Sequence, residues 1–140
     1  MSNPQPSDRS LRVVSYNVHA CIGRDRRFLP NRIADVLGPL NADFIALQEI
    51  RDRPFEGSTV SDFLAHRLQM HAYRAPTLTR GDSPYGNPLL SPAPALRSRP
   101  PALPLAGRAP PGALEAASQI RAQRCRSLIS HFGLPAHRRN

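Results

Sequence analysis

The stretch Asp43-Phe-Ile-Ala-Leu-Gln-Glu49 decides the fold, because it is almost continuously apolar and then ends in an amide and a carboxylate. A short apolar run of this kind is typical of a strand that is buried in a sheet. Leu11-Arg-Val-Val-Ser-Tyr-Asn17 predicts a second buried strand that also ends in an amide. A helical pattern separates the two runs, and this strand–helix–strand order predicts a layered α/β fold.

The helix between the two strands has recognisable ends. Pro30 suits the first helical turn, and Asn31 is a good cap. Gly38-Pro39 is expected to end or distort the helix, because proline lacks the N–H that the helix needs. The apolar residues at helical spacing are Ile33, Ala34, Leu37 and Leu40.

The pattern continues less regularly beyond the second strand. Ser58 or Ser61 is expected to cap a second helix that runs to about Met70. Strands are predicted at 72–78, 85–90, 112–117 and 126–131, with a turn at 79–84. Because Pro88 cannot donate a hydrogen bond, we expect the strand at 85–90 to be an edge strand, bulged or damaged.

Basic charge is concentrated in the last third of the chain. The net charge is +9, and every basic residue other than histidine is Arg. Residues 1–90 carry a net charge of +2, and residues 91–140 carry +7. Such a basic segment attracts phosphate-bearing partners by electrostatics that are not sequence-specific. One hypothesis is therefore a non-catalytic module that binds nucleic acid or anionic lipid through the Arg-rich C-terminal third.

Length and composition limit the organisation to one domain. The 140 residues suffice for a single domain of ordinary size, which we place at 11–140 after a disordered leader at 1–10. Seven prolines between Pro92 and Pro111 predict a poorly ordered stretch at 91–111. Two cysteines indicate free thiols rather than a disulfide framework. With neither a signal-peptide pattern nor a membrane span, the expectation is a cytoplasmic protein without stable membrane insertion.

The polar ends of the two predicted strands suggest where chemistry takes place. Strands that finish in an amide and a carboxylate bring both groups to one rim of a sheet, where ligands of α/β proteins usually lie. A hard cation such as Mg²⁺ takes carboxylate and phosphate oxygens. Glu49 is therefore a candidate metal ligand, and Asn17 is a candidate hydrogen-bond donor to phosphate; a solvated strand end is the alternative for Glu49.

Four segments in this order resemble the endonuclease/exonuclease/phosphatase superfamily. Three of them are Val14-Ser-Tyr-Asn-Val-His19, Arg32-Ile-Ala34 and Ala42-Asp-Phe-Ile-Ala-Leu-Gln-Glu49. The fourth, Tyr85-Gly-Asn-Pro-Leu-Leu-Ser91, is similar to a family strand in which alanine usually stands at the proline position. The segment Ser127-Leu-Ile-Ser-His-Phe-Gly-Leu134 is a weaker match to a strand that ends in Thr-His-Leu-Gly-Leu.

The resemblance implies an incomplete two-layer or four-layer α/β sandwich that hydrolyses a phosphoester with metal-activated water. Glu49 would bind Mg²⁺ or Mn²⁺, and Asn17 would orient the metal or a phosphate oxygen. His131 would stabilise charge in the transition state. His19, Tyr85 and Asn87 would contact the substrate, which is a nucleic acid, nucleotide, inositol phosphate or phospholipid head group.

Two motifs that the resemblance also implies are missing from the sequence. They are Gly-Asp-x-Asn, which orients water and phosphate, and Ser-Asp-His, which supplies a metal contact and a general base. We therefore expect weak or negligible turnover, because general acid–base catalysis alone contributes about 10²–10⁴-fold. A truncated or frameshifted product without a stable fold is the remaining alternative.

Overall fold

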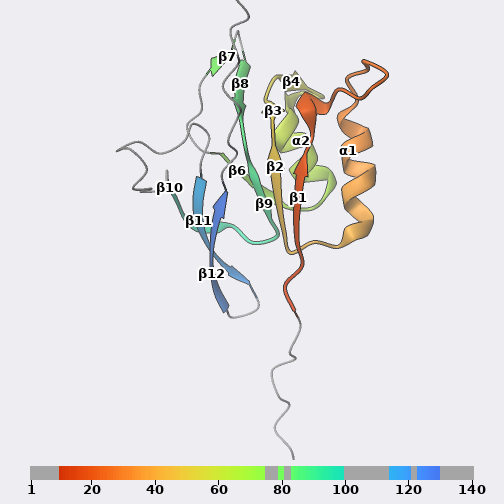
Figure 1. Cartoon of the computed structure of the whole chain (residues 1–140). Coiled ribbons are helices and arrows are strands. Elements are labelled where there is room, and N and C mark those ends of the chain that lie inside the picture. Colours follow the sequence, from red (N-terminus) through yellow and green to blue (C-terminus); the bar gives the residue numbers. More distant parts are fainter. Residues whose placement is uncertain (1–9, 75–78, 81–82, 100–113, 121–122, 130–140) are drawn as a thin grey trace, which may run out of the picture.

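A four-stranded sheet forms the centre of the computed structural model, which describes residues 10–74, 79–80, 83–99, 114–120 and 123–129 (Figure 1). Its first two strands run parallel, and the other two pair antiparallel. The order of the strands is β1 (Val13–Asn17), β2 (Phe44–Gln48), β9 (Leu89–Ser91) and β6 (His71–Tyr73). The two strands predicted from the deciding stretches are thus confirmed as neighbours in one sheet.

Strand β2 is buried on both faces, which explains its continuous apolar sequence. Ile45 and Leu47 pack into a core beneath the helices, and Phe44 packs into a second core on the opposite face. Leu89 and Leu90 of β9 divide between the same two cores. Successive side chains of a strand point to opposite faces, so two adjacent apolar residues need a covering layer on each side.

Helix α1 (Pro30–Leu37) and helix α2 (Val60–Arg67) cover one face of the sheet. Helix α1 begins at Pro30 and ends at Leu37, immediately before Gly38-Pro39 as predicted, and a short 3-10 turn, η2 (Gly38–Leu40), follows it. The buried face of α1 consists of Pro30, Ile33, Ala34 and Leu37.

The N-cap of α2 differs from the predicted Ser58 or Ser61. Thr59 is the cap, and its Oγ1 accepts a hydrogen bond from the Asp62 backbone N at 3.3 Å. Ser61 lies inside the helix and is fully buried, and its backbone N donates to Asp52 Oδ1 at 2.8 Å. The helix ends at Arg67, earlier than the predicted end near Met70.

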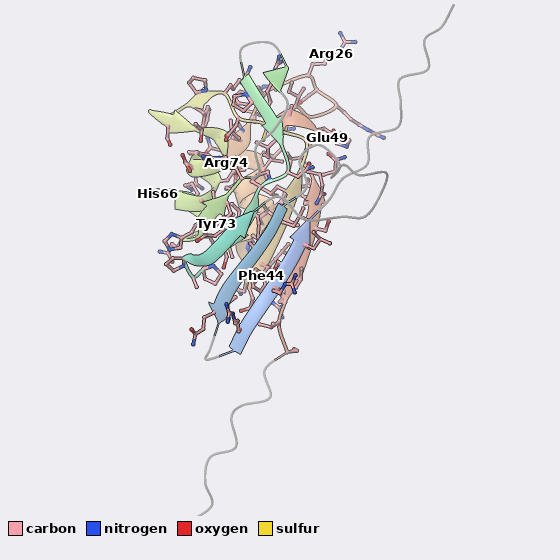
Figure 2. The ribbon with its side chains drawn as sticks, turned by 90° about the vertical axis from the view of Figure 1, so that its left-hand side faces the viewer. Arg26, Phe44, Glu49, His66, Tyr73 and Arg74 are labelled. Carbon is pink, nitrogen blue, oxygen red and sulfur yellow. The ribbon has the colours of Figure 1, made fainter. Side chains whose placement is uncertain are left out.

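A second sheet covers the other face of the first. It consists of β10 (Ala95–Arg99), β11 (Leu114–Ile120) and β12 (Gln123–Ile129), all antiparallel. In Figure 2 strands β11 and β12 stand in front of Phe44, and Tyr73 lies beside them and packs against the same core. The apolar residues buried between the sheets are Phe44, Leu89, Ala116, Ile120 and Ile129. The described residues therefore form three layers, a helical layer and two sheets, which confirms the expected α/β class.

The proline at position 88 divides the predicted strand at 85–90. Strand β8 (Ser83–Gly86) pairs with β3 (Ile50–Arg51) and β7 (Thr79–Arg80), whereas β9 joins the central sheet. Pro88 has no N–H to donate, but its carbonyl accepts from the Leu47 backbone N at 3.0 Å. The strand is thus broken, as one alternative foresaw, and its second half is interior rather than at an edge.

The remaining expectations fall partly outside the described residues. The hairpin of β4 (Pro54–Phe55) and β5 (Ser58–Thr59) was not foreseen, and Gly57 supplies its positive φ of 73°. The Pro-rich stretch 91–111 begins with the end of β9 and with β10, and residues 100–111 lie outside the described part. The leader at 1–9 is also outside it. Within the described ranges, no helix is long and apolar enough to cross a membrane.

We predict that Leu64→Ala destabilises the fold far more than Val36→Ala. Leu64 of α2 is completely buried in the core, whereas Val36 of α1 is 49% exposed. Deleting a buried leucine side chain costs about 2–5 kcal/mol, whereas an exposed valine contributes within about 0.5 kcal/mol. Urea unfolding followed by circular dichroism measures both. Equal midpoints for the two variants would show that the helical layer is not packed on the sheet.

Candidate functional site

The parallel pairing of β1 and β2 places the ends of both strands at one rim. Asn17 stands opposite Gln48 in the register. The chain after β1 is tied to the end of β2, because the Val18 backbone N donates to Gln48 O at 3.0 Å and the Ala20 backbone N donates to Glu49 O at 2.8 Å. The predicted meeting of an amide and a carboxylate at the sheet edge is thus present in the structure.

Glu49 holds its position through an unusual backbone conformation. Its φ is +59°, in the left-handed region that residues with a side chain rarely adopt. The buried Asn87 supports this conformation, since Asn87 Oδ1 accepts from the Glu49 backbone N at 3.2 Å. The side chain of Glu49 is 26% exposed, and its Oε2 lies 3.1 Å from Nδ1 of His19. The carboxylate is therefore fixed at the rim yet open to solvent.

A left-handed turn follows β1 and presents His19 to Glu49. The short element η1 (His19–Cys21) has φ values of 48°, 55° and 59° at His19, Ala20 and Cys21. Each such residue costs roughly 1–2 kcal/mol, so the surrounding structure must impose the turn. Asn17 contributes, because its Oδ1 accepts from the His19 backbone N at 3.1 Å. Asn17 thus organises the turn, and a carbonyl oxygen keeps a second lone pair for another partner.

A cavity of about 480 Å³ opens beside this turn. Asn17 and His19 line it on the side of the rim, and Arg24 and Arg32 bring positive charge. Its volume falls within the range of about 300–1,000 Å³ that is usual for small-molecule pockets. Apolar side chains form the rest of the wall, among them Val18, Ile22, Leu29 and Ile33.

An ion pair fixes the loop that borders the cavity. Nη2 of Arg32 lies 2.7 Å from Oδ2 of Asp25, and the Arg27 backbone N donates to Asp25 Oδ1 at 3.1 Å. The hydrogen bond from Arg32, followed by that from Arg27, lowers the pKa of Asp25. A Cβ on Gly23 would meet the Arg32 guanidinium, so a larger residue at this position would displace the Arg32 side chain. Asp25 is thus a turn residue of this loop, and Arg32 is its structural partner.

Cys21 contributes an inert thiol to the cavity wall. The residue is buried, and desolvation raises the pKa of its thiol to about 11, although the charge of Arg53 opposes the shift. A thiolate is the reactive form of cysteine, so a pKa this high leaves the group protonated near neutral pH. The Cys21 thiol is free, as expected.

A second charged cluster joins the residue after β3, helix α2 and the residue after β6. Nε of Arg74 lies 2.7 Å from Oδ2 of the buried Asp52, and Nη2 of Arg74 lies 2.6 Å from Oδ1 of Asp62. Arg74 is also the main cause of the lowered pKa of Asp62. Sequence reasoning missed this cluster, because its members are separated in the chain and follow no motif.

Several predicted site residues lie where the structure does not test them. His131 lies outside the described residues, and so do Arg138 and Arg139 of the basic C-terminal third. Tyr85 is part of β8, but only its backbone is described. Asn87 lies beneath Glu49, and its contact with substrate stays a prediction, as do the roles of Asn17 and His19.

The fold and the rim together define a layered α/β domain in which Asn17 and Glu49 place side-chain oxygens at the ends of β1 and β2. Its fold is that of part of an endonuclease/exonuclease/phosphatase protein. The protein of this name from Beutenbergia cavernae DSM 12333 matches with a TM-score of 0.66 at 21% identity, over 90% of this chain and 39% of that chain. A family protein from Leptotrichia buccalis C-1013-b matches with a TM-score of 0.58 at 15% identity, over 92% of this chain and 57% of that chain.

This chain therefore spans less than three fifths of either solved protein. The sequence matches neither a protein-family model nor a curated protein. The structural likeness confirms the fold that the four sequence segments implied.

We predict that Arg32→Gln raises the pKa of Asp25 toward its ordinary value. The Asp25 pKa is lowered in the native protein, so the pair stabilises the loop above that ordinary value, and the stabilisation is lost as pH falls through the lowered pKa. Titration of the Asp25 carboxyl carbon by NMR measures the change. Arg67→Gln is the matched control, because Arg67 pairs with Asp35 instead. An unchanged Asp25 titration in Arg32→Gln would contradict the pairing.

We also predict that Glu49→Gly is more stable than Glu49→Ala by about 1 kcal/mol, because only glycine adopts a φ near +59° without strain. Both variants remove the carboxylate and its contact with His19, so the difference between their stabilities measures the backbone strain at position 49. The midpoints of urea unfolding give the comparison. A Glu49→Ala protein that equals or exceeds Glu49→Gly in stability would show that this backbone is relaxed.

Proposed function

We propose that this protein binds a divalent metal ion and a phosphoester at the rim formed by the ends of β1 and β2. The reaction proposed for this rim is hydrolysis by metal-activated water, with weak or negligible turnover in this chain. The observation that carries the proposal is the Glu49 carboxylate, which a left-handed backbone and Asn87 hold at the solvent-open rim.

The donors at the rim suit a hard cation that keeps much of its water. Among the described residues, no group of three or more His, Cys, Asp or Glu side chains is placed to hold a metal. Glu49 would thus be the main protein ligand, with Asn17 Oδ1 as a second oxygen. Mg²⁺ commonly binds through one or two carboxylates together with water and substrate phosphate, so this donor set fits it better than it fits Zn²⁺.

A bound divalent ion would lower the pKa of water and neutralise charge on the phosphoryl group. The residues of this chain would then orient the reactants. Glu49 would hold the ion, and the Asn17 amide N–H would donate to a phosphate oxygen. His19, whose side chain is 71% exposed, would donate to the phosphate once Glu49 turned to the ion.

The expectation of weak turnover rests on a missing proton acceptor. The sequence has neither Gly-Asp-x-Asn nor Ser-Asp-His, the motifs that would orient water and take its proton. A general base contributes about 10²–10⁴-fold to such a reaction. His131 remains the proposed group for stabilising the transition state.

The test is metal binding, because it does not depend on turnover. Mn²⁺ is paramagnetic, so in wild-type protein it should selectively broaden the NMR signals of Asn17, His19 and Glu49. We predict that Glu49→Gln abolishes this broadening, since it removes the charged ligand. Glu56→Gln is the control, because Glu56 is an exposed carboxylate in the neighbouring β4–β5 hairpin. Equal broadening in both variants would rule out Glu49 as the ligand.

Activity provides an independent check on the second part of the proposal. With Mg²⁺ and bis(4-nitrophenyl) phosphate, turnover should stay near the uncatalysed rate in wild type. Robust hydrolysis that Glu49→Gln abolishes would confirm the metal site and show that this chain supplies its own general base.

A further inference from the structure

A hydrogen-bonded loop beside the candidate site projects three arginines into solvent. Residues 22–28 form a small hairpin, closed by an antiparallel bridge between Ile22 and Phe28. Within it, the Arg26 backbone N donates to Gly23 O at 2.9 Å, and the Gly23 backbone N donates to Arg27 O at 3.2 Å. These bonds, together with the Asp25–Arg32 pair, fix the backbone from which the arginines extend.

The hairpin is positively charged because its one acid is already engaged. Asp25 is held by the Arg32 side chain and the Arg27 backbone N. The side chains of Arg24, Arg26 and Arg27 are exposed, and within the described ranges no ion pair joins them to a carboxylate. Arg26 has a φ of +60°, so the turn holds it in a strained conformation. Figure 2 shows Arg26 projecting outward at the end of the molecule where Glu49 lies.

The cavity connects this hairpin with the rim. Asn17 and His19 line one part of its wall, and Gly23 and Arg24 of the hairpin line another. A ligand whose phosphate lies at Asn17 and His19 thus has a path along the cavity wall to the arginines. Guanidinium groups bind phosphate through paired, charge-assisted hydrogen bonds, which suits them to a second phosphate on that path.

We propose that the hairpin formed by residues 22–28 is a subsite for a second phosphate, so that the protein recognises a ligand carrying two or more phosphates in series. The proposal rests on the proposed function, which places the first phosphate at Asn17 and His19, beside the ion that Glu49 would hold. Arg24 contacts the ligand from the cavity wall, and Arg26 and Arg27 contact the phosphates beyond it. A small polyphosphate and a short nucleic-acid strand share this chemistry.

The first experiment compares linear tripolyphosphate with inorganic phosphate by calorimetry in metal-free buffer. The wild-type protein should bind tripolyphosphate more tightly by at least about tenfold. The variant R24Q/R26Q/R27Q should lose this preference. The control R12Q/R124Q/R126Q removes the same charge outside the hairpin, from the residue before β1 and from β12, and should retain it. Thermal unfolding of both variants checks that the fold persists.

A second arm identifies the source of the phosphates. Binding of hexathymidylate should weaken with salt at a slope of about −2 in log K against log salt if three arginines contact a single strand, and R24Q/R26Q/R27Q should flatten it. An effect of this variant on tripolyphosphate alone assigns the subsite to a small polyphosphate. If neither probe distinguishes it from the control, the subsite does not exist.

The outcome is separable from that of the metal site. Suppose that R24Q/R26Q/R27Q loses the preference for tripolyphosphate, while Mn²⁺ broadens the NMR signals equally in Glu49→Gln and Glu56→Gln. The hairpin would then be an anion site, and the metal proposal would be rejected. If instead the broadening depends on Glu49 and the three arginines have no effect on tripolyphosphate binding, the metal proposal would stand and the hairpin subsite would be rejected.

Discussion

The parallel pairing of β1 with β2 is the constraint on which the rest of the structure depends. Parallel strands need a crossover connection, and α1 with its flanking turns supplies it. The same pairing brings the carboxyl ends of both strands to one rim, so Asn17 and Glu49 become neighbours although 31 positions separate them. Burial of β2 on both faces then fixes its register, because a slip by one residue would exchange its two apolar faces between unlike cores.

This pairing also explains why the rim tolerates strain. The chain must turn sharply after β1 while its backbone remains bonded to the end of β2. Left-handed conformations at His19, Ala20, Cys21 and Glu49 achieve this. They persist because buried partners over-determine them, and Asn87 is the clearest example. Such strain is typical of residues whose side chains must be aimed at a ligand.

The sequence predicted the features that depend on local pattern and burial. The apolar run before Gln48-Glu49 predicted a strand covered on both sides, and Pro30 and Gly38-Pro39 predicted the ends of α1. It did not predict the left-handed turn, because neither glycine nor asparagine occurs at positions 19–21. Thr59 was missed as a cap because Ser58 and Ser61 are equally good candidates nearby. The Arg74 cluster depends on tertiary packing, which no local pattern encodes.

The buried thiol of Cys21 offers a way to measure opening of the turn at the candidate site. Alkylating reagents attack the thiolate, and both burial and the raised pKa of about 11 suppress that form in the closed turn. Cys21 is also the last residue of the strained turn, and its carbonyl accepts from the Leu29 backbone N at 3.0 Å. We therefore expect modification of Cys21 in the native protein to depend on opening of this turn. The rate at which Cys21 is alkylated therefore reports how often the turn opens, and no residue has to be substituted to measure it.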